Sequence, residues 1–120
     1  MNLKKLQIQL RKFANDRDWQ QFHELKNLAI SISIESSELL ELFQWENNDK
    51  IIKKLNNKKF KEKLSDEVAD IMLYLLRFSD LAKINLEKSC FEKIKKNEKK
   101  YPINLSKGKS DKYTTLKKKL

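Results

Sequence analysis

The sequence has very little of three residue types, with one glycine, one proline and one cysteine among 120 residues. Because glycine and proline are the usual residues of tight turns, their scarcity excludes a sheet built from many short strands. The single cysteine, Cys90, excludes an internal disulfide and favours a reducing compartment. The chain also lacks an apolar run of membrane-spanning length and a signal-type apolar segment. We therefore expect a cytoplasmic protein with no membrane partner, made of a few long helices.

Hydrophobic residues make up 39% of the chain and charged residues 37%, with a net charge of +10. A chain of this length forms one domain with a modest core, near the size at which oligomerisation often completes the core. The net charge by itself favours a nucleic-acid or anionic partner. The lysines are scattered, however, and gather at the end in Lys117-Lys118-Lys119. A solvated basic surface, or lysines that attract a polyphosphate, explains this distribution better, and we expect no nucleic-acid partner.

Apolar residues recur at spacings of three and four in four segments, the pattern of helices with one buried face. The predicted helices span residues 3–16, 25–45, 57–82 and 85–102. A polar connection covers residues 50–57 and contains a short apolar patch that is compatible with one extra helical turn. The fold class is therefore all-α. Asn57 and Asn85 are the expected N-caps of the last two helices, and Pro102 ends the fourth. The third helix is apolar nearly all round near its middle and should be the most buried.

The chain should end in a tail that differs from the rest. Residues 1–103 form the predicted domain, and residues 104–120 form a basic, loosely ordered C-terminal tail rich in serine, lysine and threonine.

Two pairs of acids lie inside the apolar helical runs, Glu35 with Glu38 and Glu67 with Asp70. The members of each pair are one helical turn apart, so both carboxylates project from the same face of their helix. Apolar residues flank both pairs at the same spacing, which places the acids on a core-facing stripe. An acid in such a position needs a partner.

If the two helices pack face to face, the four carboxylates converge in a partly dry space. Two carboxylates about 5 Å apart repel by roughly 3 kcal/mol at an effective dielectric of about 20. A hard divalent cation, Mg²⁺ before Ca²⁺, would neutralise them and bind substrate phosphates as well. The alternative is that the pairs face solvent or form salt bridges with the abundant lysines.

The segment between the first two predicted helices contains Trp19 and His23. Their structural interpretations are a tryptophan that closes the end of the bundle and a surface histidine. Their functional interpretations are a ring that stacks on a base and a hydrogen bond to a substrate. These residues by themselves leave both interpretations open.

With these features together, the chain resembles the all-α nucleotide pyrophosphohydrolases of the MazG-like superfamily, and most closely the dCTP pyrophosphatases. The segments that carry the resemblance are RDWQQFH (17–23), IESSELLELFQW (34–45), LSDEVADIMLYL (64–75) and KNEKKYP (96–102), with DKY (111–113) in the tail. They occur in the family's order and cover most of residues 10–102. The departures are Ile34, Ser36 and Ser37, which stand where glycines are usual in the family and reshape the expected pocket floor.

The resemblance implies a four-helix bundle completed by oligomerisation, as a homodimer or homotetramer with active sites at subunit contacts. It implies a Mg²⁺-dependent, nucleotide-pool house-cleaning hydrolase that splits a nucleoside triphosphate, dCTP or a modified dCTP, into monophosphate and pyrophosphate. The implied metal ligands are Glu35, Glu38, Glu67 and Asp70. Glu35 or Glu38 is also the candidate that orients and deprotonates the attacking water. The implied substrate-binding residues are Trp19, His23, Trp45, Lys93, Lys96, Asn97 and Tyr101.

Two other functions fit parts of the same pattern. A broad-specificity pyrophosphatase would act on modified or non-canonical triphosphates rather than selectively on dCTP. A non-enzymatic, basic helical protein would bind nucleic acid or an acidic partner and use the acid pairs in salt bridges. It would show salt-sensitive binding to nucleic acid and no stabilisation by Mg²⁺.

Overall fold

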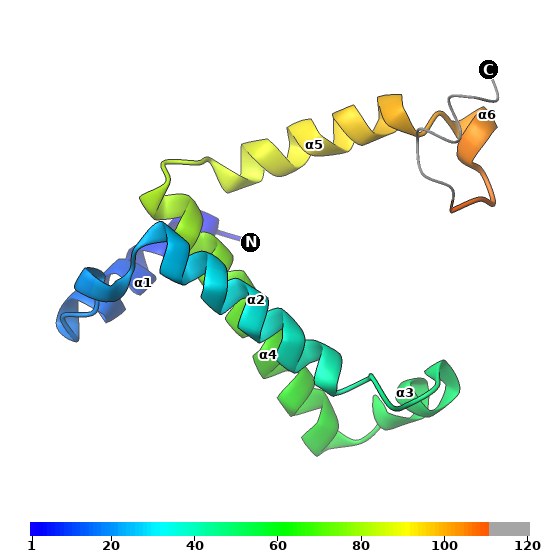
Figure 1. The fold of residues 1–120 in the computed structure, drawn as a ribbon, viewed down its shortest axis with the longest axis horizontal. Coiled ribbons are helices and arrows are strands. Elements are labelled where there is room, and N and C mark those ends of the chain that lie inside the picture. The colour runs from blue at the N-terminus through cyan, green and yellow to red at the C-terminus, as the bar shows by residue number, and fades with distance from the viewer. Residues whose placement is uncertain (111–120) are drawn as a thin grey trace. The chain divides into compact units, whose positions relative to one another are not determined.

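The computed structural model describes residues 1–110 and confirms the all-α fold class. These residues contain no strand. Their helices are α1 (Leu3–Asp16), α2 (Leu25–Glu41), α3 (Asn48–Lys54), α4 (Lys58–Leu81), α5 (Leu86–Lys100) and α6 (Ile103–Ser106), with the 3-10 turn η1 (Gln20–Phe22) before α2 (Figure 1). The chain divides into two compact units, Met1–Ile84 and Asn85–Leu120, here called the first and the second unit.

Asparagine begins four of these helices. The side-chain oxygens of Asn2, Asn47, Asn57 and Asn85 each accept a hydrogen bond from the backbone N–H three residues later, at 3.0 to 3.1 Å. Such a cap satisfies one of the N–H groups that a helix N-terminus leaves without a partner. The predicted caps Asn57 and Asn85 are confirmed.

The connection after α2 differs from the prediction. α2 ends at Glu41 instead of continuing to Trp45, and the turn that follows leads to Asn47, which caps α3. An asparagine side chain competes with helical hydrogen bonding and is better satisfied at a cap than inside a helix, so a new helix begins here. The extra helical turn considered within the polar connection, residues 50–57, is part of α3, which begins earlier than expected.

α4 is the central helix of the first unit, as expected from its apolar middle. It runs antiparallel to α2 and also packs against α1 (Figure 1). The fully buried apolar side chains in the described residues are Ala14, Leu28 and Leu76, one from each of the three helices. Each buried leucine contributes roughly 1.5 to 3 kcal/mol to stability. The side-chain amide of Gln7 joins α1 to α4 by donating to the carbonyl of Leu76 at 3.1 Å.

α4 ends without the glycine that commonly follows a helix. Lys83 has a left-handed backbone with φ 59°, and the N–H of Ile84 donates to the carbonyl of Ser79 at 2.9 Å, which is a Schellman motif. The only glycine of the chain is Gly108. A residue with a Cβ therefore adopts the left-handed conformation here, at a cost of roughly 1 to 2 kcal/mol.

The second unit contains α5 and α6, and α5 leaves its apolar residues Phe91 and Ile94 exposed. Residues 104–106, which the sequence assigned to a loosely ordered tail, complete α6. The DKY segment (111–113) and Lys117-Lys118-Lys119 lie outside the described residues. Within residues 1–110, no helix is both long enough and apolar enough to span a bilayer.

Candidate functional site

The four predicted acids lie on the two antiparallel helices, Glu35 and Glu38 on α2 and Glu67 and Asp70 on α4. One carboxylate oxygen from each of Glu35, Glu38 and Glu67 lies within 4.8 Å of the others. These three partly buried residues are here called the acid cluster. Helical spacing predicted that the acids of each pair share a face. The convergence expected if the two helices pack face to face is found for three of the four acids.

The acid cluster has no ion-pair partner within residues 1–110. One oxygen of Glu35 and one oxygen of Glu67 are buried without a hydrogen-bond partner. The pKa of Glu35 is raised to about 7, first by burial, then by a hydrogen bond with Glu38 and repulsion from it, and then by the charges of Asp70 and Glu67. Burial also raises the pKa of Glu67, with Glu38 as the next cause. The acid cluster therefore carries negative charge that no ion-paired cation balances in the described residues.

A hard divalent cation fits this arrangement. Carboxylate oxygens are the preferred ligands of Mg²⁺ and Ca²⁺, and a cation would satisfy the two buried oxygens that have no donor. A structural salt-bridge role for the acids disagrees with the absence of such bridges in the described part of the chain. Asp70 is exposed and lies outside the converging three, although its charge contributes to the raised pKa of both Glu35 and Glu67.

A cleft of about 100 Å³ lies beside Asp70. α1, the segment that follows it and α4 form its walls. Its lining residues are Leu10, Phe13, Trp19, His23, Asp70, Leu73, Tyr74 and Arg77. Aromatic and apolar side chains with a few polar groups are typical of a ligand pocket. The cleft thus brings together Trp19 and His23, both predicted to contact substrate, beside a predicted metal ligand.

The end of α1 positions the ring of Trp19. Asp18 has a left-handed backbone with φ 52°, and the N–H of Trp19 donates to the carbonyl of Ala14 at 2.9 Å, which is a second Schellman motif. The chain therefore turns back over the last turns of α1. There the rings of Trp19 and Phe13 meet edge to face, with centroids 5.7 Å apart. The Schellman motif at the end of α1 thus places Trp19 in one wall of the cleft.

His23 follows η1 and contacts α4. Its Nδ1 accepts a hydrogen bond from Nε of Arg77 at 3.0 Å. Burial lowers the pKa of His23, and the positive charge of Arg77 lowers it further. The histidine is therefore neutral near pH 7.

Arg77 is a charged residue of the cleft that was not predicted from the sequence. It lies within the apolar run of α4 and is only 6% exposed. A charged residue inside an apolar helical run was the available signal, and the same signal identified the acids. The partner was not visible in the sequence, because His23 is 54 positions away.

The other five predicted substrate residues belong to other segments of the chain. Trp45 follows the end of α2, is 86% exposed and does not line the cleft. Lys93, Lys96, Asn97 and Tyr101 lie on α5 and its C-cap in the second unit. The roles of all five residues stay predictions.

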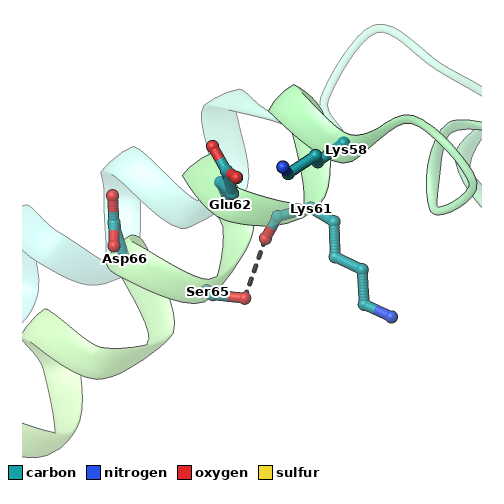
Figure 2. Close-up of a pocket in the computed structure, with 5 residues that line it drawn as sticks. All are labelled: Lys58, Lys61, Glu62, Ser65 and Asp66. Carbon is teal, nitrogen blue, oxygen red and sulfur yellow. Dashed lines mark hydrogen bonds between the residues drawn. The ribbon is translucent and has the colours of Figure 1, made fainter.

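A shallower hollow lies along the first half of α4 (Figure 2). Its lining residues are Lys58, Lys61, Glu62, Ser65 and Asp66, all of them exposed. The hydroxyl of Ser65 donates to the backbone carbonyl of Lys61 at 2.8 Å, so it is satisfied within the helix (Figure 2). Charges of both signs from one helix describe a solvated face, and we assign no ligand to it.

Known proteins resemble the chain along most of its length. The model of the MazG-like family matches residues 30–116. Over 105 residues the chain is 34% identical to dCTP pyrophosphatase 1 of Rattus norvegicus and 32% identical to dCTP pyrophosphatase 1 of Homo sapiens. Each match covers 88% of this chain and 62% of the relative. The chain therefore spans less than two thirds of the length of these relatives.

The fold is also found in a solved structure. The crystal structure of a pyrophosphatase from Archaeoglobus fulgidus matches with a TM-score of 0.78 and 42% sequence identity, over 85% of this chain and 94% of that chain. The family match includes all four predicted acids, so the site and the fold point to the same relatives. On these grounds the chain belongs to the MazG-like family.

Proposed function

We propose that this chain is a Mg²⁺-dependent nucleoside triphosphate pyrophosphohydrolase that cleaves between the α and β phosphates and prefers dCTP or a modified dCTP. The observation that carries the proposal is the acid cluster, with two buried oxygens that lack partners, next to an aromatic cleft. The names of the relatives, dCTP pyrophosphatase 1 and a pyrophosphatase, support the same reaction. A cytoplasmic role in clearing the nucleotide pool fits this activity.

The acid cluster would hold Mg²⁺, with Asp70 as the fourth ligand expected from the sequence. The oxygen-only ligand set of Glu35, Glu38 and Glu67 favours Mg²⁺ or Ca²⁺ over softer transition metals. When bound, the ion supplies positive charge against the phosphate oxygens as the bond to pyrophosphate breaks. The carboxylates, in turn, lose the mutual repulsion that raises their pKa values.

A carboxylate on α2 is the proposed general base. Glu35 or Glu38 orients the attacking water and accepts its proton. The water oxygen forms a bond to the α-phosphorus, while the in-line bond from this phosphorus to the bridging oxygen breaks and pyrophosphate leaves. The products are a nucleoside monophosphate and pyrophosphate.

The cleft is the proposed binding site of the base. The ring of Trp19 would stack on the base, and His23 would supply a hydrogen bond to the edge of the base. Further proposed contacts to base, sugar and phosphates are Trp45, Lys93, Lys96, Asn97 and Tyr101.

Self-association as a homodimer or homotetramer is part of the proposal. Ile30 and Ile34 on α2 and Val68 on α4 are exposed in the first unit, whose fully buried core is small. A second copy of the chain that covered these side chains would remove apolar surface from water. Light scattering across a concentration series tests this, and a monomer at every concentration would reject it.

The reaction is tested with a panel of triphosphates, Mg²⁺ and pyrophosphate detection. The panel contains dCTP, 5-methyl-dCTP, dUTP and the purine triphosphates, and we expect turnover to be fastest with the first two. Comparable turnover of the whole panel would instead indicate a broad-specificity pyrophosphatase. Absence of turnover together with salt-sensitive nucleic-acid binding would indicate the non-enzymatic alternative.

A pair of substitutions on α2 tests the acid cluster in the same assay. Glu38→Gln removes a charge from the cluster and is expected to lower kcat by about 100-fold or more. Glu41→Gln changes an exposed acid on the same helix and is expected to keep full activity. Full activity of Glu38→Gln would remove the metal site from the mechanism.

A further inference from the structure

We propose that Arg77 is a positioning residue for the base site: it holds His23 in the tautomer whose Nε2 carries the hydrogen, so that the cleft presents one fixed N–H donor. This inference rests on the proposed function, because it assigns the cleft to a nucleobase. It adds Arg77 as a positioning residue and Nε2 of His23 as the atom that selects which bases bind.

The hydrogen bond between the two residues has only one possible direction. Nε of Arg77 lies 3.0 Å from Nδ1 of His23. Guanidinium nitrogens donate and do not accept, so Nδ1 must be the acceptor and carries no hydrogen. A neutral imidazole has a single N–H, and that hydrogen is then on Nε2. The lowered pKa of His23 favours this neutral ring.

Arg77 is itself held in place. It is almost fully buried, and its Nη1 lies 3.7 Å from a carboxylate oxygen of Asp80 one turn later. Nε and Nη2 of Arg11 on α1 donate to the two oxygens of Asp80, each at 2.6 Å. Asp80 thus balances the buried guanidinium and ties it to α1. The guanidinium of Arg77 cannot turn away from His23 without also leaving the carboxylate of Asp80 that balances its charge.

The second ring nitrogen of His23 is left for a ligand. Nε2 has no hydrogen-bond partner in the part of the chain that the structure describes, and the ring lines the cleft with Trp19 and Asp70. A base that binds here must offer an acceptor, such as a carbonyl oxygen or an unprotonated ring nitrogen of a pyrimidine. A base with an N–H at this point would place two donors face to face, and its affinity would fall by about tenfold or more.

The tautomer is read directly by NMR. His23 is the only histidine of the chain, so its ring ¹⁵N signals are unambiguous. In long-range ¹H–¹⁵N spectra of the full chain above neutral pH, we expect a fully unprotonated Nδ1 and a protonated Nε2. A protonated Nδ1, or the averaging of two tautomers that an unconstrained ring shows, would overturn the proposal. Because no substrate is needed, this failure is distinct from a failure of the proposed function.

Three substitutions separate positioning from packing. Arg77→Met removes the donor, whereas Arg77→Gln keeps an amide N–H at the same number of bonds from the backbone. Arg11→Met removes the other arginine of Asp80 without a contact to His23. We expect tautomer averaging in Arg77→Met and the fixed tautomer in the other two. An unchanged tautomer in Arg77→Met would overturn the proposal, and the wild-type spectrum still tests it if that variant does not fold.

The kinetic test uses the pyrophosphate assay. Arg77→Met is expected to raise KM for the preferred triphosphate about tenfold with little change in kcat, because it weakens one hydrogen bond to the base. Arg77→Gln is expected to restore KM. An equal loss in Arg11→Met, or a loss confined to kcat, would mean that Arg77 acts only through the fold.

Discussion

Glu35 on α2 and Glu67 on α4 each bury one carboxylate oxygen that no hydrogen-bond donor reaches in the described residues. Glu38 adds an oxygen within 4.8 Å of both side chains. Three acids in this arrangement destabilise the metal-free protein through repulsion and burial. A bound cation removes both costs, so cation affinity and folding stability are linked.

Mg²⁺ is expected to raise the unfolding temperature of the chain. At a free concentration 100 times Kd, a ligand that binds only the folded state stabilises it by about 2.7 kcal/mol. Thermal unfolding in EDTA and in Mg²⁺ measures this difference. Glu67→Gln should lose most of it, whereas Glu62→Gln, an exposed acid on the same helix, should keep it. Equal Mg²⁺ effects in the two variants would contradict the prediction.

The lowered pKa of His23 makes stability depend on pH below neutrality. The unfolded chain takes up a proton on this residue near pH 6.5, whereas the folded chain resists protonation. At this residue the unfolded state then binds more protons, so the contribution of His23 to stability declines as pH falls from 6.5 to the folded pKa and is constant above 6.5. The raised pKa values of Glu35 and Glu67 act in the opposite direction, so the contribution of His23 is measured as the difference between wild type and His23→Gln. Urea unfolding over this pH range measures the slope. His23→Gln should show a smaller slope, and curves of equal slope would show that the residue does not contribute.

Asp80 balances two arginines, the buried Arg77 and the exposed Arg11. Removal of Asp80 should therefore cost more stability than removal of Arg11. Asp80→Asn leaves the buried Arg77 without a counter-charge and is expected to cost about 3 kcal/mol. Arg11→Met should cost about 1 kcal/mol or less, since the side chain of Arg11 is 54% exposed. Urea unfolding of both variants gives the comparison. The reverse order of costs would mean that Asp80 does not compensate Arg77.

Lys83 carries a left-handed backbone where a glycine is usual, and glycine should relieve the strain. We expect Lys83→Gly to stabilise the chain by about 1 kcal/mol, after allowance for the greater freedom of glycine in the unfolded state. Lys61→Gly, at an exposed position inside α4, should instead destabilise it by about 1 kcal/mol. Thermal unfolding of both variants tests the contrast in sign, which a loss of stability in Lys83→Gly would refute.

Helical periodicity was sufficient to predict the long helices and the helix faces on which the acids lie. Glu35 and Glu38 share a face because they are one turn apart, and the packing of α2 against α4 brings that face to Glu67. Periodicity gives the face on which a residue lies and not its partner on another element. The contact of Arg77 with His23 could therefore not be predicted from periodicity.

The helix boundaries that were missed depended on local competition. The apolar pattern of α2 continues past Glu41 to Trp45, but the side chain of Asn47 forms a cap that starts a separate helix. The outcome depends on a difference of about 1 kcal/mol between capped and continuous helix. The hydrophobic pattern does not predict which of the two helices is more stable.

The Schellman motif at Asp18 connects the exchange of one backbone amide to the state of the cleft. The amide hydrogen of Trp19 is bonded to the carbonyl of Ala14, and the indole of the same residue forms a wall of the cleft. Unwinding of this turn would release the amide and displace the indole in one event. Deuterium uptake at this single amide therefore reports how often the cleft loses that wall. A ligand stacked on the indole should slow the uptake at a proton that it never touches.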